Sequence, residues 1–404
     1  MKTLSVIAIV FCVSFTSLAQ STETTQAQLD TLRSQGYEAL YNLDYETARR
    51  SFREMMRIAP DHPAGAQCFA ASLWLQQLNE SWELQATLYN EKSYARDNQK
   101  LDAARVKDFQ HWIRTAKALS QARLRRDPTD QEALYLLGAA EGLEAAFTAA
   151  IERKFMRALR SGSDSVEHHR ALLKLTPGMR DAELTIGLYN YILGALPLPL
   201  KLLARSFGVS GSKKRGLETL ERVSREGHWA RDVARVLLVD LYKREKRWDD
   251  AIQVSRELAD RYSRNYLFKL QLADALTAKI AASRRVNVDQ LEISRLFDSL
   301  LSDKRLEPST VDLVHFRYGE TLLELGDSGR ALGEFQRVAN DNSADIGLRA
   351  LSRLRVAQCL DLEGKRHEAL ATYRLILADR TANAAQEGAR KGLREVYQLQ
   401  PKND

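Results

Sequence analysis

The chain has 404 residues, of which 44% are hydrophobic and 28% charged, and its formal net charge is +7. This composition is ordinary for a soluble globular protein. The positive surplus is modest for the length and is diluted by acidic residues, which favours a solvated surface over a nucleic-acid-binding one. The eight prolines leave long stretches without a helix breaker, as an almost wholly helical protein requires.

The first residues have the pattern of a signal peptide. Lys2 supplies a positive charge, residues 4–13 form an apolar run, and Ser17-Leu18-Ala19 places small residues at a signal-peptidase site. The apolar run is too short to span a bilayer securely, so an uncleaved anchor is the weaker alternative. We predict a signal peptide over 1–19, a polar linker over 20–28, and export to a bacterial periplasm or the medium.

Cysteine usage is sparse. Cleavage would remove Cys12 and leave Cys68 and Cys359, which are nearly a chain length apart and lie among apolar neighbours. We interpret both as small core residues, although an oxidising compartment would permit an intermolecular disulfide.

Small and aromatic residues recur at fixed offsets over a background of helical periodicity. Gly36 is followed after twelve residues by Ala48, and then by Phe52. Parts of the same pattern recur at Gly138, Gly187, Ala251, Gly319, Ala331, Phe335, Ala369 and Tyr373. These offsets resemble the tetratricopeptide repeat (TPR), a helix–turn–helix of about 34 residues. We therefore predict an all-α fold, a right-handed TPR-like superhelix (α-solenoid) of stacked antiparallel helical hairpins.

Within a hairpin, we expect the glycine of the first helix to let the second helix approach closely. The alanine then marks the crossing, and the aromatic residue fills the space one turn further on. Irregular long helices are expected over 79–126, and a polar insertion with one short helix over 282–309. TPR-like repeats are accordingly predicted over 29–281 and 310–404, the latter ending in a capping helix.

No catalytic, cofactor-binding or metal-binding constellation is expected, and the chain is predicted not to be an enzyme. His168 and His169 are adjacent and point about 100° apart on a helix, which favours a solvent-facing helix turn over a metal site. The loop from Gly208 to Lys214 lacks the spacing of a phosphate-binding loop and follows a helix. We expect a tight turn between helices there, with weak anion binding as the alternative.

Repeat solenoids bind partners through the concave face that the first helix of each hairpin lines. Counting along these helices gives five candidates for a partner groove: Tyr135, Leu188, Tyr191, Asp240 and Phe316. Aromatic anchors of this kind suit an extended peptide or a partner helix. The alternative is that they pack against neighbouring hairpins.

The stretch from residue 182 to residue 229 carries a more specific likeness. In GLYNYILGALPLPLKLLARSFGVSGSKKRGLETL, an aromatic-bearing helix leads through a Leu-Pro pair into a Gly-x-Ser-Gly loop and a Gly-Leu-x-x-Leu helix. This order resembles the hairpin of the inclusion-body-clearance (Iml-type) and tetratricopeptide-repeat-thirty-nine-type proteins. Ser212-Lys213 departs from the acidic–basic pair common in that family. The resemblance implies an all-helical binding or adaptor protein.

These observations predict an exported TPR-type scaffold that binds a peptide or protein partner in its concave groove, with no nucleic acid and no cofactor. Peripheral association with the cell envelope is compatible with this hypothesis. Two alternatives remain open. The first is a solute- or lipid-binding module that uses the Pro197–Phe207 segment, and the second is a non-catalytic subunit of an envelope enzyme complex.

Overall fold

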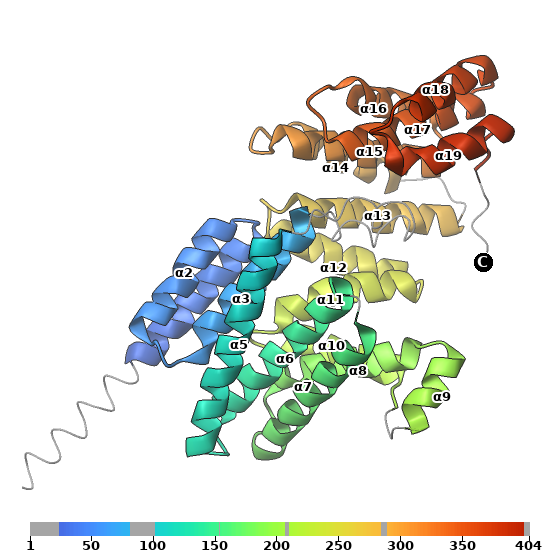
Figure 1. The fold of residues 1–404 in the computed structure, drawn as a ribbon. Helices are drawn as coiled ribbons and strands as arrows, with labels where there is room; N and C mark the ends of the chain where they lie inside the picture. The colour runs from blue at the N-terminus through green and yellow to red at the C-terminus, as the bar shows by residue number, and fades with distance from the viewer. Residues whose placement is uncertain (1–23, 81–101, 153, 207–209, 284–288, 400–404) are drawn as a thin grey trace, which may run out of the picture. The chain divides into compact units, whose positions relative to one another are not determined.

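A computed structural model describes residues 24–80, 102–152, 154–206, 210–283 and 289–399 (Figure 1). These residues form helices and no strand, so the all-α prediction is confirmed. The predicted signal peptide lies outside the described residues. The first described helix covers residues 24–41, so the linker expected over 20–28 is already helical from residue 24.

The chain divides into two compact units inside α11 (Arg231–Arg244). Of the described residues, the first unit comprises 24–78 and 102–235. Its elements after helix 24–41 are α2 (Tyr45–Ile58), α3 (Pro63–Glu80), α5 (Ala103–Arg126), α6 (Gln131–Ala150), α7 (Phe155–Leu175), the 3-10 turn η1 (Arg180–Ala182), α8 (Glu183–Ala195), α9 (Leu198–Ser206) and α10 (Lys213–Glu226).

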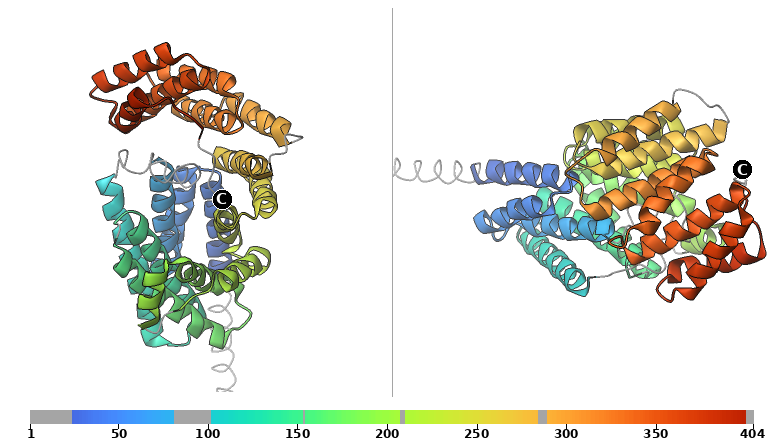
Figure 2. Two further views of the ribbon diagram at one scale, coloured as in Figure 1. Left: turned by 90° about the vertical axis from the view of Figure 1, so that its right-hand side faces the viewer. Right: turned by 90° about the horizontal axis from the view of Figure 1, so that it is seen from above.

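The second unit comprises residues 79–80 and 236–399 of the described chain. Its helices after α11 are α12 (Trp248–Arg261), α13 (Tyr266–Ser283), α14 (Asp289–Leu301), α15 (Pro308–Glu324), α16 (Ser328–Asn340), α17 (Ile346–Leu362), α18 (Arg366–Ala378) and α19 (Asn383–Arg394). Consecutive helices from α15 to α19 pack against one another, as the orange to red ribbons in Figure 2 show. The short helix expected inside the polar insertion is α14, and the expected capping helix is α19.

Four of the turns between consecutive helices share one backbone conformation. Leu43, Lys246, Gly326 and Gly364 have positive φ angles, between 57° and 84°. After each of them, the next backbone N–H donates to the carbonyl five residues earlier, as from Asp327 to Leu322 at 2.9 Å. This is the Schellman arrangement, which satisfies free carbonyls at the end of a helix. Each left-handed residue precedes its repeat alanine by five positions, so the turn has the same length in every case.

The repeat positions pack as the offsets predict. A Cβ atom on Gly319 of α15 would lie 2.6 Å from Cε1 of Phe335 on α16, closer than any real side chain could come. Gly36 stands in the same relation to Phe52. The repeat alanines Ala48, Ala251, Ala331 and Ala369 are fully buried. A further pair, Gly392 of α19 against Tyr373 of α18, repeats the arrangement at a position the sequence pattern did not single out.

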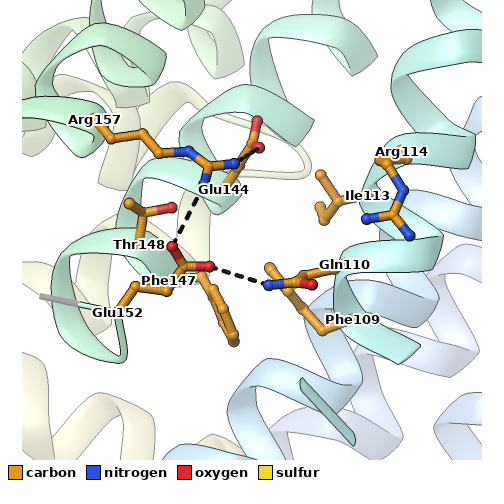
Figure 3. Close-up of a pocket in the computed structure, with 9 residues that line it drawn as sticks. All are labelled: Phe109, Gln110, Ile113, Arg114, Glu144, Phe147, Thr148, Glu152 and Arg157. Carbon is orange, nitrogen blue, oxygen red and sulfur yellow. Dashed lines mark hydrogen bonds and ion pairs between the residues drawn. The ribbon is translucent and has the colours of Figure 1, made fainter. Parts of the chain in front are cut away.

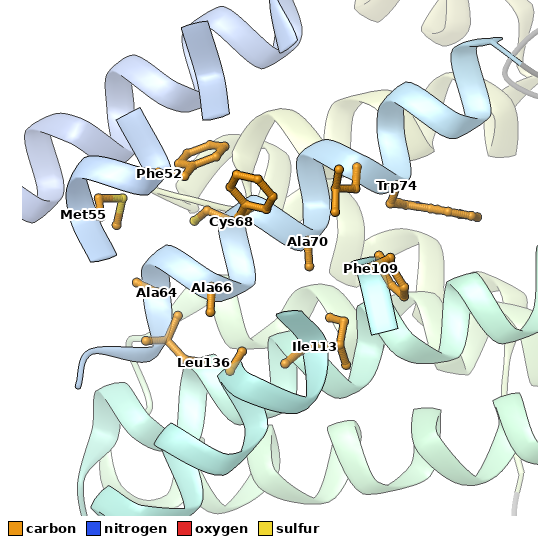
Figure 4. Close-up of a cluster of buried hydrophobic side chains, with 14 of the residues drawn as sticks. Phe52, Met55, Ala64, Ala66, Cys68, Ala70, Trp74, Phe109, Ile113 and Leu136 are labelled. Carbon is orange, nitrogen blue, oxygen red and sulfur yellow. The ribbon is translucent and has the colours of Figure 1, made fainter. Parts of the chain in front are cut away.

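The core of the first unit joins helix 24–41 to α2, α3, α5 and α6 (Figure 4). Phe52, Trp74, Phe109 and Leu136 are among its buried side chains, and each contributes about 1.5–3 kcal/mol by leaving water. Cys68 lies in the same cluster as a free thiol, and burial raises its pKa.

Cys359 in the second unit is equally buried and free, and burial raises its pKa to about 12. The prediction that both cysteines are core residues is therefore confirmed. Two thiols without solvent exposure, neither of them readily ionised, are poorly placed for a disulfide between molecules.

Ion pairs, one of them buried, connect successive first helices of the second unit. Arg317 of α15 donates to both carboxylate oxygens of Asp274 of α13 at 2.8 Å, and both side chains are about 5% exposed. Arg355 of α17 donates to Glu320 of α15 at 3.0 Å. A buried charge that loses its partner costs about 3–5 kcal/mol, so these pairs hold one register between the hairpins.

Candidate functional site

The five residues predicted to line a partner groove do not form one exposed site. Tyr135, Leu188 and Tyr191 belong to the first unit, whereas Asp240 and Phe316 belong to the second. The three aromatic side chains are between 1% and 7% exposed. Their prediction as solvent-facing anchors is therefore wrong, and each is buried for a physical reason that the contacts make clear.

Tyr135 on α6 is covered by Arg33 from helix 24–41. The guanidinium carbon of Arg33 lies 5.7 Å from the centroid of the Tyr135 ring and 4.2 Å from that of Trp229, which follows α10. Asp181 fixes the turn that carries Trp229, because its carboxylate accepts the backbone N–H groups of His228 and Ala230 at 2.8 and 2.9 Å. Cation–π contacts stabilise the buried Arg33, and Arg33 in turn helps to bury Tyr135.

Tyr191 on α8 is buried because α8 and α10 approach backbone to backbone. A Cβ on Gly216 would lie 2.6 Å from the backbone nitrogen of Tyr191, and a Cβ on Gly211 would lie 2.5 Å from Cβ of Leu193. Gly194 is equally close to the start of α10. The side chain of Ser212 caps α10 by accepting from the N–H of Arg215 at 3.4 Å. The described part of the Gly/Ser loop, residues 210–212, leads directly into α10, and the rest of the tight turn expected before Lys214 lies outside the described residues.

The other three predicted groove residues have ordinary structural surroundings. Phe316 of α15 packs edge-on against Phe335, with ring centroids 5.4 Å apart. Asp240 is half-buried and pairs with Lys243 one turn later, Oδ1 to Nζ 3.0 Å. Leu188 is half-buried on α8. Phe316 therefore packs inside its own hairpin, against the second helix α16.

The adjacent histidines occupy two different environments. His169 is 1% exposed, so the prediction of a solvent-facing turn is wrong for it. Its Nε2 donates to the carbonyl of Tyr135 at 3.0 Å, its Nδ1 accepts from the hydroxyl of Thr185 at 2.5 Å, and burial lowers its pKa to about 4. His168 instead contacts Glu141 at 2.8 Å. No group of three metal-ligating side chains comes together within the described residues.

A cavity of about 170 Å³ lies between α5, α6 and the start of α7 (Figure 3). Phe109 and Phe147 stack beneath it with their ring centroids 4.1 Å apart. The carboxylates at its rim are already paired, Glu152 with Gln110 at 3.0 Å and Glu144 with Lys117 at 2.7 Å. The cavity therefore offers no unsatisfied carboxylate to a ligand.

The clearest exposed apolar surface is formed by α9 and the end of α8. We call it the α9 surface and define it by Ile192, Leu198, Leu200 and Leu202, which are 43%, 67%, 50% and 55% exposed. Among the described helices, α9 makes its main contact with α8, beside which Figure 1 draws it at the edge of the first unit. Neither the cavity above nor an open depression lined by Thr24, Leu32 and Ile58 includes a residue of α9.

The sequence marks this segment by its Leu-Pro pair, and only the solute- or lipid-binding alternative would have its leucines line a cavity. Proline at the second position of α9 is tolerated because the first turn of a helix needs no internal N–H bond. The helix is only nine residues long, too short to hide leucines on every side without a partner. Within the described residues, no helix combines the length and apolar composition that crossing a bilayer requires.

The hairpins, their Schellman turns and their buried repeat positions define a tetratricopeptide-repeat-like α-solenoid. Comparison with solved structures finds human IFIT1 bound to the capped RNA m7Gppp-AAAA, at 13% identity over 91% of this chain and 87% of that one, with a TM-score of 0.41. A tetratricopeptide repeat protein from Parabacteroides merdae matches at 13% identity over 82% and 98%, with a TM-score of 0.30. Yeast Tom70 matches at 10% identity over 88% and 87%, with a TM-score of 0.35. No family model and no curated protein matches the sequence.

Proposed function

We propose that the protein is an exported, non-catalytic scaffold that binds a protein partner, and that the α9 surface is where the partner docks. One observation carries this proposal: four large apolar side chains are 43–67% exposed on adjoining turns of two helices. Burial of a leucine side chain gains about 1.5–3 kcal/mol. A cluster left in water is therefore a ready source of binding free energy.

The interior of the first unit supports the same assignment. Tyr135, one of the residues expected to line a peptide-binding groove, is buried beside Arg33, which also contacts Trp229. A partner that docks on α9 needs no rearrangement of this cluster. The scaffold would thus present a short apolar helix at its edge instead of receiving a peptide inside its curve.

The test is recovery of partners from envelope extracts by the full chain and by a Leu200→Asp variant. Leu375→Asp is the matched control, because Leu375 is 70% exposed on α18 and lies in the second unit. We expect partner recovery to fall at least tenfold with Leu200→Asp, which corresponds to about 1.4 kcal/mol, and to persist with Leu375→Asp.

Native mass spectrometry of the purified chain separates this proposal from the solute- or lipid-binding alternative. The scaffold proposal expects a protein to co-purify. If only a small molecule or lipid co-purified with the chain, and its recovery fell with Leu200→Asp, the scaffold proposal would be wrong.

A further inference from the structure

We propose that α9 inserts into an apolar groove with an acidic rim on the partner protein. The inference rests on the proposed function and deepens it, because it states the shape and the charge of the surface that receives the helix. In this mode of recognition, an amphipathic or apolar helix lies in a groove of its partner. Here the solenoid supplies the helix, which reverses the roles expected of a repeat protein with a concave binding face.

The shape follows from where the exposed leucines lie around α9. Residues four apart on a helix lie about 40° apart, so Leu198 and Leu202 share one side. Leu200 lies about 160° away from both, on the opposite side of the helix. All three are at least 50% exposed. A flat surface, whether of a protein or of a bilayer, would cover one side and leave the other in water, whereas a groove covers both.

The charge follows from the surrounding sequence. Residues 184–217 contain no Asp or Glu, and their basic residues are Lys201, Arg205, Lys213, Lys214 and Arg215. Lys214 at the start of α10 keeps 87% of its side chain exposed, even though Glu218 lies 4.0 Å away. The helix α9 itself carries Lys201 and Arg205 and no carboxylate, which makes it complementary to an apolar surface edged with carboxylates.

The same charge distribution argues against a second copy of the chain as the occupant. Two α9 surfaces that met face to face would bring like charges together without a compensating carboxylate in either segment, and like-charge juxtaposition is costly. A partner whose groove is rimmed by Asp and Glu avoids this cost and gains association rate from electrostatic attraction.

Site-specific photo-cross-linking in the full-length chain tests the groove. The photoreactive probe p-benzoylphenylalanine replaces Leu198, Leu200 or, as the control, Leu375, and cells that produce the protein natively are irradiated. We expect the probes at positions 198 and 200 to cross-link to the same partner protein. The cross-linked residues of that partner should be apolar, with Asp or Glu nearby in the partner's sequence or structure. We expect the probe at 375 not to attach to it. Cross-linking from only one side of α9, or adducts with lipid or with a second copy, would overturn the inference.

Charge reversal tests the acidic rim. Arg205→Glu and Lys214→Glu should each lower the cross-linking yield at position 200 several-fold, and more at low salt than at high salt. Lys304→Glu, an exposed position in the second unit, should leave the yield unchanged. An unchanged yield with the first two variants would refute the acidic rim while docking through α9 stood. If the partner did not dock on α9 at all, the Leu200→Asp variant would recover it as fully as the parent chain does. That result would contradict the proposed function itself.

Discussion

At the scale of single residues, the repeat glycines allow close helix packing because they have no Cβ atom. Gly319 faces the ring of Phe335 with no room for a methyl group, whereas Gly333 in the neighbouring helix has nothing within 4 Å of a Cβ. The sequence distinguishes these two glycines by the twelve-residue offset from Gly319 to Ala331. The packing role of Gly319 is therefore predictable from the amino-acid sequence alone.

Substitution of these glycines by alanine should have opposite effects on stability. Gly319→Ala forces Phe335 from its rotamer and should lower the free energy of unfolding by about 1–3 kcal/mol. Gly333→Ala sits in an open helical position and should raise it by up to about 1 kcal/mol. Urea denaturation of both variants provides the measurement. Equal effects of the same sign would show that α15 and α16 do not cross at Gly319.

His169 shows what residue spacing could not reveal. Its neighbour in sequence, His168, faces Glu141, and the two side chains were expected to share a solvent-facing turn. The glycine at position 138 admits the imidazole of His169 between α6 and α7, with a hypothetical Cβ only 2.5 Å from its Cδ2 atom. Such a contact joins residues on different helices, so no local pattern encodes it.

The buried imidazole makes stability depend on pH. The pKa of His169 is about 4 in the folded chain against 6.5 for the unperturbed side chain, chiefly because burial disfavours its charged form. The unfolded chain therefore takes up a proton first, and stability is full above pH 6.5 and declines towards pH 4. The decline from this group amounts to about 3 kcal/mol, at 1.36 kcal/mol for each unit of pKa. The hydrogen bond from His168 to Glu141 raises the pKa of His168, so this second histidine offsets part of the stability that His169 loses at low pH.

Denaturation of the parent chain and of His169→Gln at pH 7.5 and pH 4.5 would isolate the effect. The glutamine can still donate to the carbonyl of Tyr135 but does not titrate. The parent should lose more stability than the variant between the two pH values. A parallel decline would mean that His169 titrates normally and is not held neutral by burial.

At the scale of elements, the α8–α10 hairpin combines the most predictable and the least predictable features of the chain. Its helices, Leu-Pro pair and Gly/Ser turn were all expected from the sequence. Counting positions along α8 predicted an exposed Tyr191, because it could not show that Gly216 lets α10 cover this residue. Tyr135 was misjudged for a similar reason, since Arg33 reaches it from a helix about a hundred residues earlier in the chain.

Aspartate substitutions distinguish core from contact in this hairpin. Tyr191→Asp places a carboxylate at a position only 3% exposed and should cost several kcal/mol, enough to disrupt the first unit. Leu200→Asp alters a half-exposed side chain and should change the unfolding free energy by no more than about 0.5 kcal/mol. Circular dichroism during thermal unfolding would report both. A strong destabilisation by Leu200→Asp would place α9 in the core and remove it as a docking surface.

At the scale of the whole molecule, the solenoid class and the positions of most helices follow from the sequence, because repeat packing is local and periodic. The boundary between the two units does not follow from the sequence. The chain divides between Arg235 and Val236 inside α11, where no change in composition marks the boundary.

Export is the other whole-molecule property that we propose. Production of the full sequence in a bacterium with a general secretion pathway should yield a periplasmic or secreted protein whose first residue is Gln20. Intact-mass measurement and N-terminal sequencing of the fractionated protein would establish this. A chain that retained residues 1–19 in the cytoplasm would contradict the proposal.

The central claim is that partners dock on α9 and not on the inner faces of the hairpins. Backbone hydrogen–deuterium exchange of the full chain, alone and with its purified partner, tests it most directly. We predict that slowed exchange on binding concentrates in α9 and the end of α8. Slowed exchange in α6, α11 and α15, around Tyr135, Asp240 and Phe316, with none in α9, would contradict it.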